Sequence, residues 1–168
     1  FTPTAGLKVH IPLDEGDGKS IHASVEGLVH TLKFDAGYAW TPAKEARKGL
    51  VIRNGPSVAL PDAGDFERDQ AFAVSLWLRL SKPNLTGAAL ARMDDPPTYR
   101  GWDVWVQDGR VGIHLIHNWP NDALKVVTRS QLPVNQWVHV GIVYDGSAKA
   151  AGMKVFVNGV EQPVAIEA

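Results

Sequence analysis

The chain has 168 residues, a length that fits one domain, with 45% hydrophobic and 21% charged residues. Its formal net charge is −1 with acidic and basic residues interleaved, so the basic stripe typical of a nucleic-acid-binding protein is absent. It has no cysteine, which excludes disulfides, thiolate metal sites and covalent haem attachment from this segment, and no apolar run approaches the roughly 18 residues of a membrane span.

The first third of the chain predicts short strands separated by turn residues. Lys8 to Leu13 is expected to be a strand that ends in the acidic, glycine-rich turn Asp14 to Gly18. Gly49 to Arg53 and Ser57 to Leu60 are predicted as a further pair of short strands, and Ala43 to Lys48 is compatible with one helical turn. Frequent Pro and Gly between segments of period-two alternation indicate a sandwich or barrel.

The later strands alternate more regularly between apolar and polar residues. Asp108-Gly109 predicts a two-residue hairpin turn, and the short connections favour antiparallel neighbours. We therefore predict an all-β, antiparallel β-sandwich that forms a single domain over residues 1–168. The predicted strands are Ala71 to Leu80, Gly101 to Gln107, Arg110 to Asn118, Leu124 to Ser130, Trp137 to Tyr144 and Met153 to Val157.

Alternation also predicts which side chains face outward. The apolar set of each strand should face the core, so the mixed set should lie on the outer face. If these strands are neighbours in one sheet, that face combines aromatic and polar groups, a combination that suits sugars. The alternative is that loops cover this face and that Trp77 and Trp105 pack beneath them. The outward set comprises Ser75, Trp77, Arg79, Asp103, Trp105, Gln107, His114, Asn118, Lys125 and Arg129.

A second candidate region is the loop after the strand that contains His114. Trp119 precedes a proline that stiffens this loop, and Asn118, Asn121 and Asp122 can exchange hydrogen bonds with sugar hydroxyls. Arg100, in the preceding loop, could orient a ligand at the same place. The alternative is a structural turn in which Trp119 folds back on the sheet edge.

Catalytic and metal-binding patterns are weak. Glycosidases need two carboxylates roughly 5–10 Å apart, and no predicted strand carries a Glu-x-Asp-x-Glu pattern. No Gly-x-Ser-x-Gly nucleophile elbow occurs either, so we predict that the protein is not an enzyme. His114 and His117 should point to opposite faces of a strand. Asp14 and Asp17 could offer oxygens to calcium, although such a run is more often a solvated turn, and no other cofactor is expected in this segment.

Five segments together resemble one known family. They are Val9–Gly18, Phe72–Leu78, Leu132–Val140, Tyr144–Gly146 and Val155–Gly159. In this order they resemble the laminin-G-like domains of the concanavalin A-like superfamily. The resemblance implies a jelly-roll sandwich and a glycan or polysaccharide as the ligand. Family members usually continue beyond the last of these segments, so we expect this chain to lack its final strands.

A narrower likeness concerns Phe66–Asp69, Leu115–Pro120 and Asp145–Gly152. These segments resemble laminin-G-like modules embedded in large planctomycetal proteins that also carry c-type cytochrome domains. That resemblance implies an exported parent protein, periplasmic or at the cell surface, whose haem lies in other domains. The chain is then expected to be a piece of a multi-domain protein, with the neighbouring domains as its partners.

Two functional hypotheses follow. The first is a non-catalytic, lectin-like module that binds a glycan on the outer face of one sheet and the adjoining loops. Its candidate ligand-binding residues are Arg100, Asp103, Trp105, His114, Asn118, Trp119, Asn121 and Asp122. The alternative is a structural or protein-docking module within the exported parent protein.

Overall fold

The structure is a computed structural model that describes residues 5–34, 37–43, 48–52, 58–60 and 63–168. Its contacts divide the chain into two compact units, Phe1–Gly64 and Asp65–Ala168. The described residues contain no helix that is both long and apolar enough to cross a membrane. The single domain expected over residues 1–168 stays a prediction.

The 1–64 unit consists of two small antiparallel sheets. Strands β1 (Val9–His10), β2 (Ser20–Val25) and β3 (Leu28–Lys33) form one, and β4 (Tyr38–Pro42) pairs with β5 (Lys48–Ile52) in the other. Ile21, Ala23 and Phe34 are buried, and the rings of Tyr38 and Trp40 pack within about 6 Å of Phe34.

Sequence reasoning located the 1–64 unit only in part. The strand expected at Gly49–Arg53 is confirmed as β5 up to Ile52, whereas Val58 to Leu60 form no strand. Arg53, Ser57 and most of the helical turn expected at Ala43 to Lys48 lie outside the described residues. Strand β3 escaped prediction because its side chains are mostly exposed, which leaves little apolar alternation to detect.

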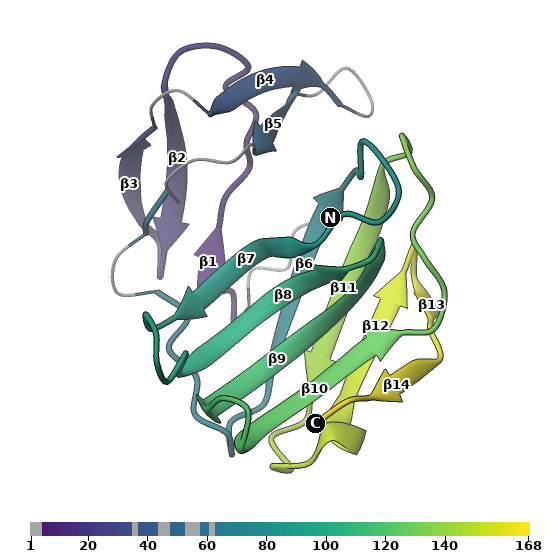
Figure 1. Ribbon diagram of the computed structural model, residues 1–168. Helices are drawn as coiled ribbons and strands as arrows, with labels where there is room; N and C mark the ends of the chain where they lie inside the picture. Colours follow the sequence, from purple (N-terminus) through teal and green to yellow (C-terminus); the bar gives the residue numbers. More distant parts are fainter. Residues whose placement is uncertain (1–4, 35–36, 44–47, 53–57, 61–62) are drawn as a thin grey trace. The chain divides into compact units, whose positions relative to one another are not determined.

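The 65–168 unit confirms the predicted antiparallel β-sandwich. A five-stranded sheet has the order β14-β10-β9-β8-β7, and a four-stranded sheet has the order β13-β12-β11-β6 (Figure 1). The strands are β6 (Phe72–Leu78), β7 (Gly87–Met93), β8 (Gly101–Gln107), β9 (Arg110–Asn118), β10 (Asp122–Thr128), β11 (Val138–Tyr144), β12 (Met153–Val157), β13 (Val160–Glu161) and β14 (Val164–Ile166).

The core of this unit lies between the two sheets. Val104, Val111 and Ile113 from the five-stranded sheet meet Val140 and Val155 from the four-stranded sheet, and all five are fully buried. Burial of each such side chain contributes roughly 1.5–3 kcal/mol. These positions alternate with outward-facing ones, so the buried set fixes which side chains the outer faces carry.

Strand pairing corrects one expectation about the outer face. Strands β8, β9 and β10 are neighbours in one sheet, but β6 belongs to the other sheet. Ser75 and Trp77 therefore do not share a face with Asp103 and His114, because the two outer faces of a sandwich point away from each other. The Asp108-Gly109 turn is confirmed, and both residues have the positive φ values that a two-residue hairpin requires.

Candidate functional site

Three side chains form a row across the outer face of the five-stranded sheet. In the β8–β9 register Asp103 lies opposite His114, and in the β9–β10 register His114 lies opposite Lys125. Directly opposite residues on one face have Cβ atoms about 5 Å apart. The strand pairing alone thus brings an acid, an imidazole and an amine together.

Asp103 fixes the imidazole of His114. One carboxylate oxygen, Oδ1, accepts the backbone N–H of His114 at 3.1 Å and lies 2.8 Å from Nδ1 of the same residue. A carboxylate oxygen can only accept here, so Nδ1 carries a proton, and in the neutral form of the imidazole Nε2 is then an acceptor. Only 5% of the Asp103 side chain and 9% of the His114 side chain are exposed, which places the pair at the floor of the face.

Two indole rings flank the fixed imidazole. Trp105 packs against His114 with ring centroids 5.7 Å apart, and Trp119 does so at 5.3 Å, both edge to face. Each indole is half-buried, so part of each ring stays accessible to a ligand. Trp119 therefore folds over the outer face and contacts its central imidazole.

Close strand pairing beside Trp105 requires a glycine. Gly112 lies opposite Trp105, and a Cβ at Gly112 would come within 2.1 Å of the backbone oxygen of Val126. No side chain other than hydrogen fits that position without displacing β10. The glycine consequently maintains the register that places His114 between Asp103 and Lys125.

Lys125 belongs to a second polar group on the same face. Its Nζ lies 2.8 Å from Oε2 of Glu167 and donates a hydrogen bond to Oε1 of Gln107 at 2.6 Å. The same nitrogen lies 5.9 Å from the centre of the Trp119 ring. Gln107 in turn donates to both carboxylate oxygens of Glu167 at 3.1–3.2 Å. We call these seven residues the outer-face cluster: Asp103, Trp105, Gln107, His114, Trp119, Lys125 and Glu167.

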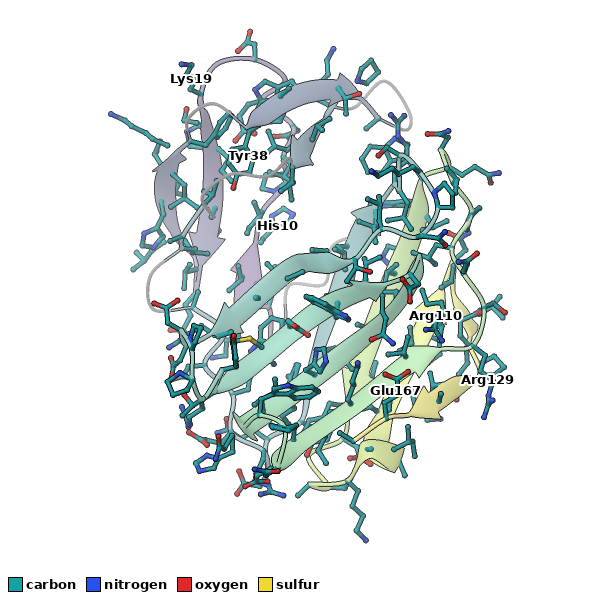
Figure 2. All side chains as sticks on the ribbon, in the orientation of Figure 1. His10, Lys19, Tyr38, Arg110, Arg129 and Glu167 are labelled. Atoms are coloured by element: carbon teal, nitrogen blue, oxygen red, sulfur yellow. The ribbon has the colours of Figure 1, made fainter. Side chains whose placement is uncertain are left out.

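The charges of this second group stabilise each other. The hydrogen bond from Lys125 lowers the pKa of Glu167, against the opposing effect of burial, with smaller contributions from Gln107 and from the charges of Lys125 and Arg110. Figure 2 shows Arg110 and Glu167 on the same part of the unit. Glu167 is therefore ionised, and its ion pair with Lys125 is in place, at neutral pH.

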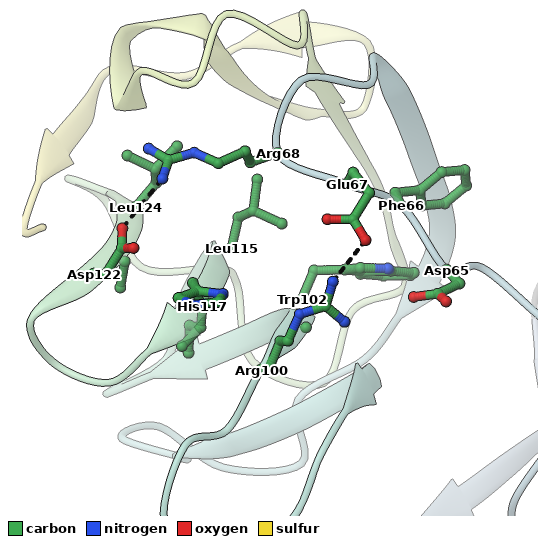
Figure 3. A pocket seen from close by; sticks show the side chains of 13 residues that line it. Asp65, Phe66, Glu67, Arg68, Arg100, Trp102, Leu115, His117, Asp122 and Leu124 are labelled. Atoms are coloured by element: carbon green, nitrogen blue, oxygen red, sulfur yellow. Dashed lines mark hydrogen bonds and ion pairs between the residues drawn. The ribbon is translucent and has the colours of Figure 1, made fainter.

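Two other predicted residues lie at a separate place, a cavity of about 50 Å³ that we call the end pocket (Figure 3). Arg100 pairs with Glu67 at 2.6 Å, and Arg68 lies 3.4 Å from Asp122. The hydrogen bond from Arg100 to Glu67 raises the pKa of the Arg100 guanidinium. Apolar side chains, including Trp102, Leu115 and Leu124, also line the pocket.

The structure thus separates the predicted site residues into groups. Asp103, Trp105, His114 and Trp119 come together, whereas Arg100 and Asp122 line the end pocket. Asn118 and Asn121 are exposed near the β9–β10 turn. His117 faces the end pocket and His114 faces the cluster, as expected for residues three apart on a strand.

Sequence reasoning missed three members of the cluster as site residues. Alternation placed Gln107 and Lys125 in the outward set. Their contact with each other reaches from β8 to β10, across β9, and no pattern in the sequence near either residue indicates it. Glu167 follows β14, a three-residue strand next to a proline that lacks a readable alternation. Its position could be found only from the pairing of β14 with β10.

The candidate calcium ligands lie in the 1–64 unit. Asp14 and Asp17 are both exposed, and Glu15 between them accepts the backbone N–H of His22 at 2.6 Å and lies 3.0 Å from its imidazole. Burial raises the pKa of Glu15, but hydrogen bonds from its own backbone N–H and from His22 outweigh this effect and lower the pKa overall. Among the described residues no group of three or more His, Cys, Asp or Glu has the arrangement of a metal site.

Comparison with protein-family models gives a match over most of the chain. Residues 53–167 match a laminin-G family model described as the concanavalin A-like lectin/glucanases superfamily. This range includes every residue of the outer-face cluster and of the end pocket. No curated protein matches the sequence.

Proposed function

Because the chain belongs to the concanavalin A-like lectin/glucanases superfamily, we propose that it is a non-catalytic carbohydrate-binding module that holds a glycan on the outer-face cluster. The observation that carries the proposal is the position of His114 between two accessible indole rings. Aromatic faces bind the apolar C–H surface of a sugar ring, and a fixed acceptor between them can take a hydroxyl proton.

The polar members of the cluster have distinct roles in this proposal. Nε2 of His114 accepts a sugar hydroxyl, and Asp103 is a positioning residue that holds the imidazole and contacts no ligand. Gln107 and Lys125 border the ligand, with their geometry already fixed by Glu167. A preorganised arrangement of this kind lowers the entropic cost of binding.

The charge balance supports a neutral glycan as the ligand. The Lys125 side chain is 12% exposed and forms an ion pair with Glu167. The Asp103 carboxylate is in contact with the imidazole of His114. A uronate or sulfate group would have to break the ion pair with Glu167 to reach Lys125. Affinity should be modest, because sugar hydroxyls exchange hydrogen bonds with water for hydrogen bonds with protein at little net gain.

The same contacts favour binding over catalysis. A glycosidase needs one carboxyl group to donate a proton and a second to act as nucleophile or base. Here the carboxylates of Asp103 and Glu167 both accept hydrogen bonds from neighbouring side chains. We also propose, from the family resemblance of its motifs, that the module is exported as part of a larger protein and adjoins further domains.

A glycan array tests the proposed function. The protein is applied once with calcium and once with a chelator, next to the variants Trp105→Ala and Trp119→Ala and the control Val160→Ala, which is exposed on the other sheet. We expect neutral glycans to be bound by the wild type and the control, and binding to be lost in both tryptophan variants.

The outcomes separate the two functional hypotheses. Binding that both tryptophan variants retain would place the ligand elsewhere. A blank array from folded protein would favour the structural or docking module instead. Equal binding with calcium and with the chelator would show that recognition needs no metal, whereas loss in the chelator would direct attention to the acidic turn at Asp14 and Asp17.

A further inference from the structure

The four-stranded sheet carries an exposed aromatic residue of its own. Trp77 is 47% exposed and lies near the end of β6, the edge strand of this sheet. Directly across the β6–β11 pairing is His139, with ring centroids 5.3 Å apart. Nearly half of the Trp77 side chain is therefore accessible to a ligand.

Hydrogen bonds hold the imidazole beside Trp77 in place. Nε2 of His139 lies 3.0 Å from the hydroxyl of Ser75, and its backbone N–H donates to the side-chain oxygen of Asn158 at 2.9 Å. The backbone N–H of Asn158 donates back to the His139 carbonyl at 2.8 Å. The ring pair is thus fixed by groups from β6 and from the β12–β13 turn.

A glycine lies next to this row. Gly141 lies between Ser75 on β6 and Phe156 on β12. A Cβ at Gly141 would contact only the Cβ of Phe156, at the ordinary distance of 3.7 Å, so packing does not require glycine there. This contrasts with Gly112, where a side chain would collide with backbone. A methyl group at Gly141 is therefore sterically tolerated on the face that carries Trp77.

The chemistry of this surface fits a sugar. It combines an indole face with a hydroxyl, an imidazole and a carboxamide, and its five residues carry no carboxylate, lysine or arginine. Lys154 and Glu161 on the neighbouring strands lie 3.3 Å from each other in an ion pair, and the guanidinium of Arg79, two residues after Trp77, lies 5.7 Å from the centre of the Trp137 ring. Such a surface favours a neutral ligand with both C–H and hydroxyl faces over an anion or an entirely apolar partner.

We propose that Ser75, Trp77, His139, Gly141 and Asn158, the Trp77 platform, form a second binding site for a neutral glycan. This inference rests on the proposed function only in taking sugar as the ligand class, since it involves different residues on the other sheet. The two outer faces of a sandwich point in opposite directions. The module would then engage two chains of a polysaccharide, or two stretches of one chain, at the same time.

Indole N–H signals in two-dimensional ¹H–¹⁵N NMR spectra report on each site separately. The six tryptophans are assigned with single Trp→Phe variants, and the protein is titrated with cellohexaose, xylohexaose, mannohexaose and laminarihexaose. We expect at least one of these to shift the Trp77 signal, also in the Trp105→Ala/Trp119→Ala double variant. The Trp105 and Trp119 signals of the wild type test the outer-face cluster in the same titration, so the two proposals can fail independently.

Variants on the same strand give the matched controls. Gly141→Ala should fold normally and weaken the Trp77 response at least threefold, because its methyl group would project from the surface that the ligand contacts. Val143→Ala, 42% exposed on the same strand, should leave the response unchanged. On an insoluble polysaccharide made of the responding sugar, Trp77→Ala should weaken retention about tenfold or more, since linked sites raise avidity.

Two results would overturn the inference. One is a Trp77 signal that stays unchanged with all four hexasaccharides in folded protein. The other is self-association, seen by sedimentation velocity, that Trp77→Ala abolishes, because that would make a second copy of the chain the occupant of this face.

Discussion

Asp103 and His114 face each other across the β8–β9 pair, and a single carboxylate oxygen of Asp103 holds both the backbone N–H and the Nδ1 of His114. This relationship determines the orientation of the imidazole on the outer face of the five-stranded sheet. Because Trp105 and Trp119 both pack against that imidazole, it also positions the two rings that we propose to contact sugar.

Truncation of Asp103 should therefore reduce stability and binding together. Asp103→Ala leaves two buried N–H groups of His114 without an acceptor, at a cost of about 1–3 kcal/mol each. We expect urea unfolding to show a loss of at least about 2 kcal/mol. Asp122→Ala, which removes an exposed partner of Arg68, should cost less than about 1 kcal/mol. Equal stability of the two variants would contradict the role assigned to Asp103.

Substitution by alanine should strongly reduce stability at Gly112 and leave it almost unchanged at Gly141. Gly112→Ala places a methyl group within 2.1 Å of the Val126 carbonyl oxygen, so β9 and β10 must separate. We expect a loss of about 3 kcal/mol or insoluble protein. Gly141→Ala should change the free energy of unfolding by less than about 1 kcal/mol, because its methyl group meets no close neighbour. Thermal unfolding of the two variants measures the difference directly.

The Lys125–Glu167 pair should make stability depend on pH in the acidic range. The pKa of Glu167 is lowered in the folded state, so its contribution to stability is complete above the ordinary value of 4.5 and is lost as the pH falls through the lowered folded value. Lys125→Met should flatten this dependence, because the carboxylate loses its main partner.

The melting temperature, followed from neutral pH to about pH 3, measures this effect. Lys154→Met is the matched control, since Lys154 pairs with Glu161 at an exposed position on the other sheet. The control should keep the acid-induced loss of the wild type. If Lys125→Met lost stability on acidification as steeply as the control, Glu167 would not depend on Lys125.

Tyr144 should stabilise the loop that lines the end pocket. Its hydroxyl donates to the carbonyl oxygen of Arg68 and accepts the backbone N–H of Ala148 at 2.7 Å. Tyr144→Phe removes both bonds and should cost about 1–3 kcal/mol, measured by urea unfolding. Tyr99→Phe, at an exposed position, should be neutral within about 0.5 kcal/mol.

The sequence revealed the sandwich because its central strands alternate between apolar and mixed side chains. Val111, Ile113 and Leu115 alternate with outward residues along β9, and the Asp108-Gly109 turn marks where β8 ends. Such local signals fix strand bounds and faces. They predicted β8, β9 and β12 with the bounds that the structure shows.

Strand neighbours were harder to predict than strands. Nothing local indicates that β6 pairs with β11 rather than joining β8, so Trp77 was expected on the wrong face. Strand β7, with its sequence Gly-Ala-Ala-Leu-Ala-Arg-Met, has too few large apolar side chains for a clear period. The Lys125–Glu167 contact depends on residues 42 positions apart that meet only through β14.

The most direct test of glycan binding on the outer face is an affinity comparison. The neutral glycan that binds best on the array is titrated calorimetrically into the wild type, Trp105→Ala, Trp119→Ala and the exposed control Val160→Ala, each shown to be folded by circular dichroism. We expect both tryptophan variants to lose about tenfold or more in affinity, equivalent to about 1.4 kcal/mol, and the control to bind like the wild type. Wild-type affinity in both tryptophan variants would contradict a glycan site around His114.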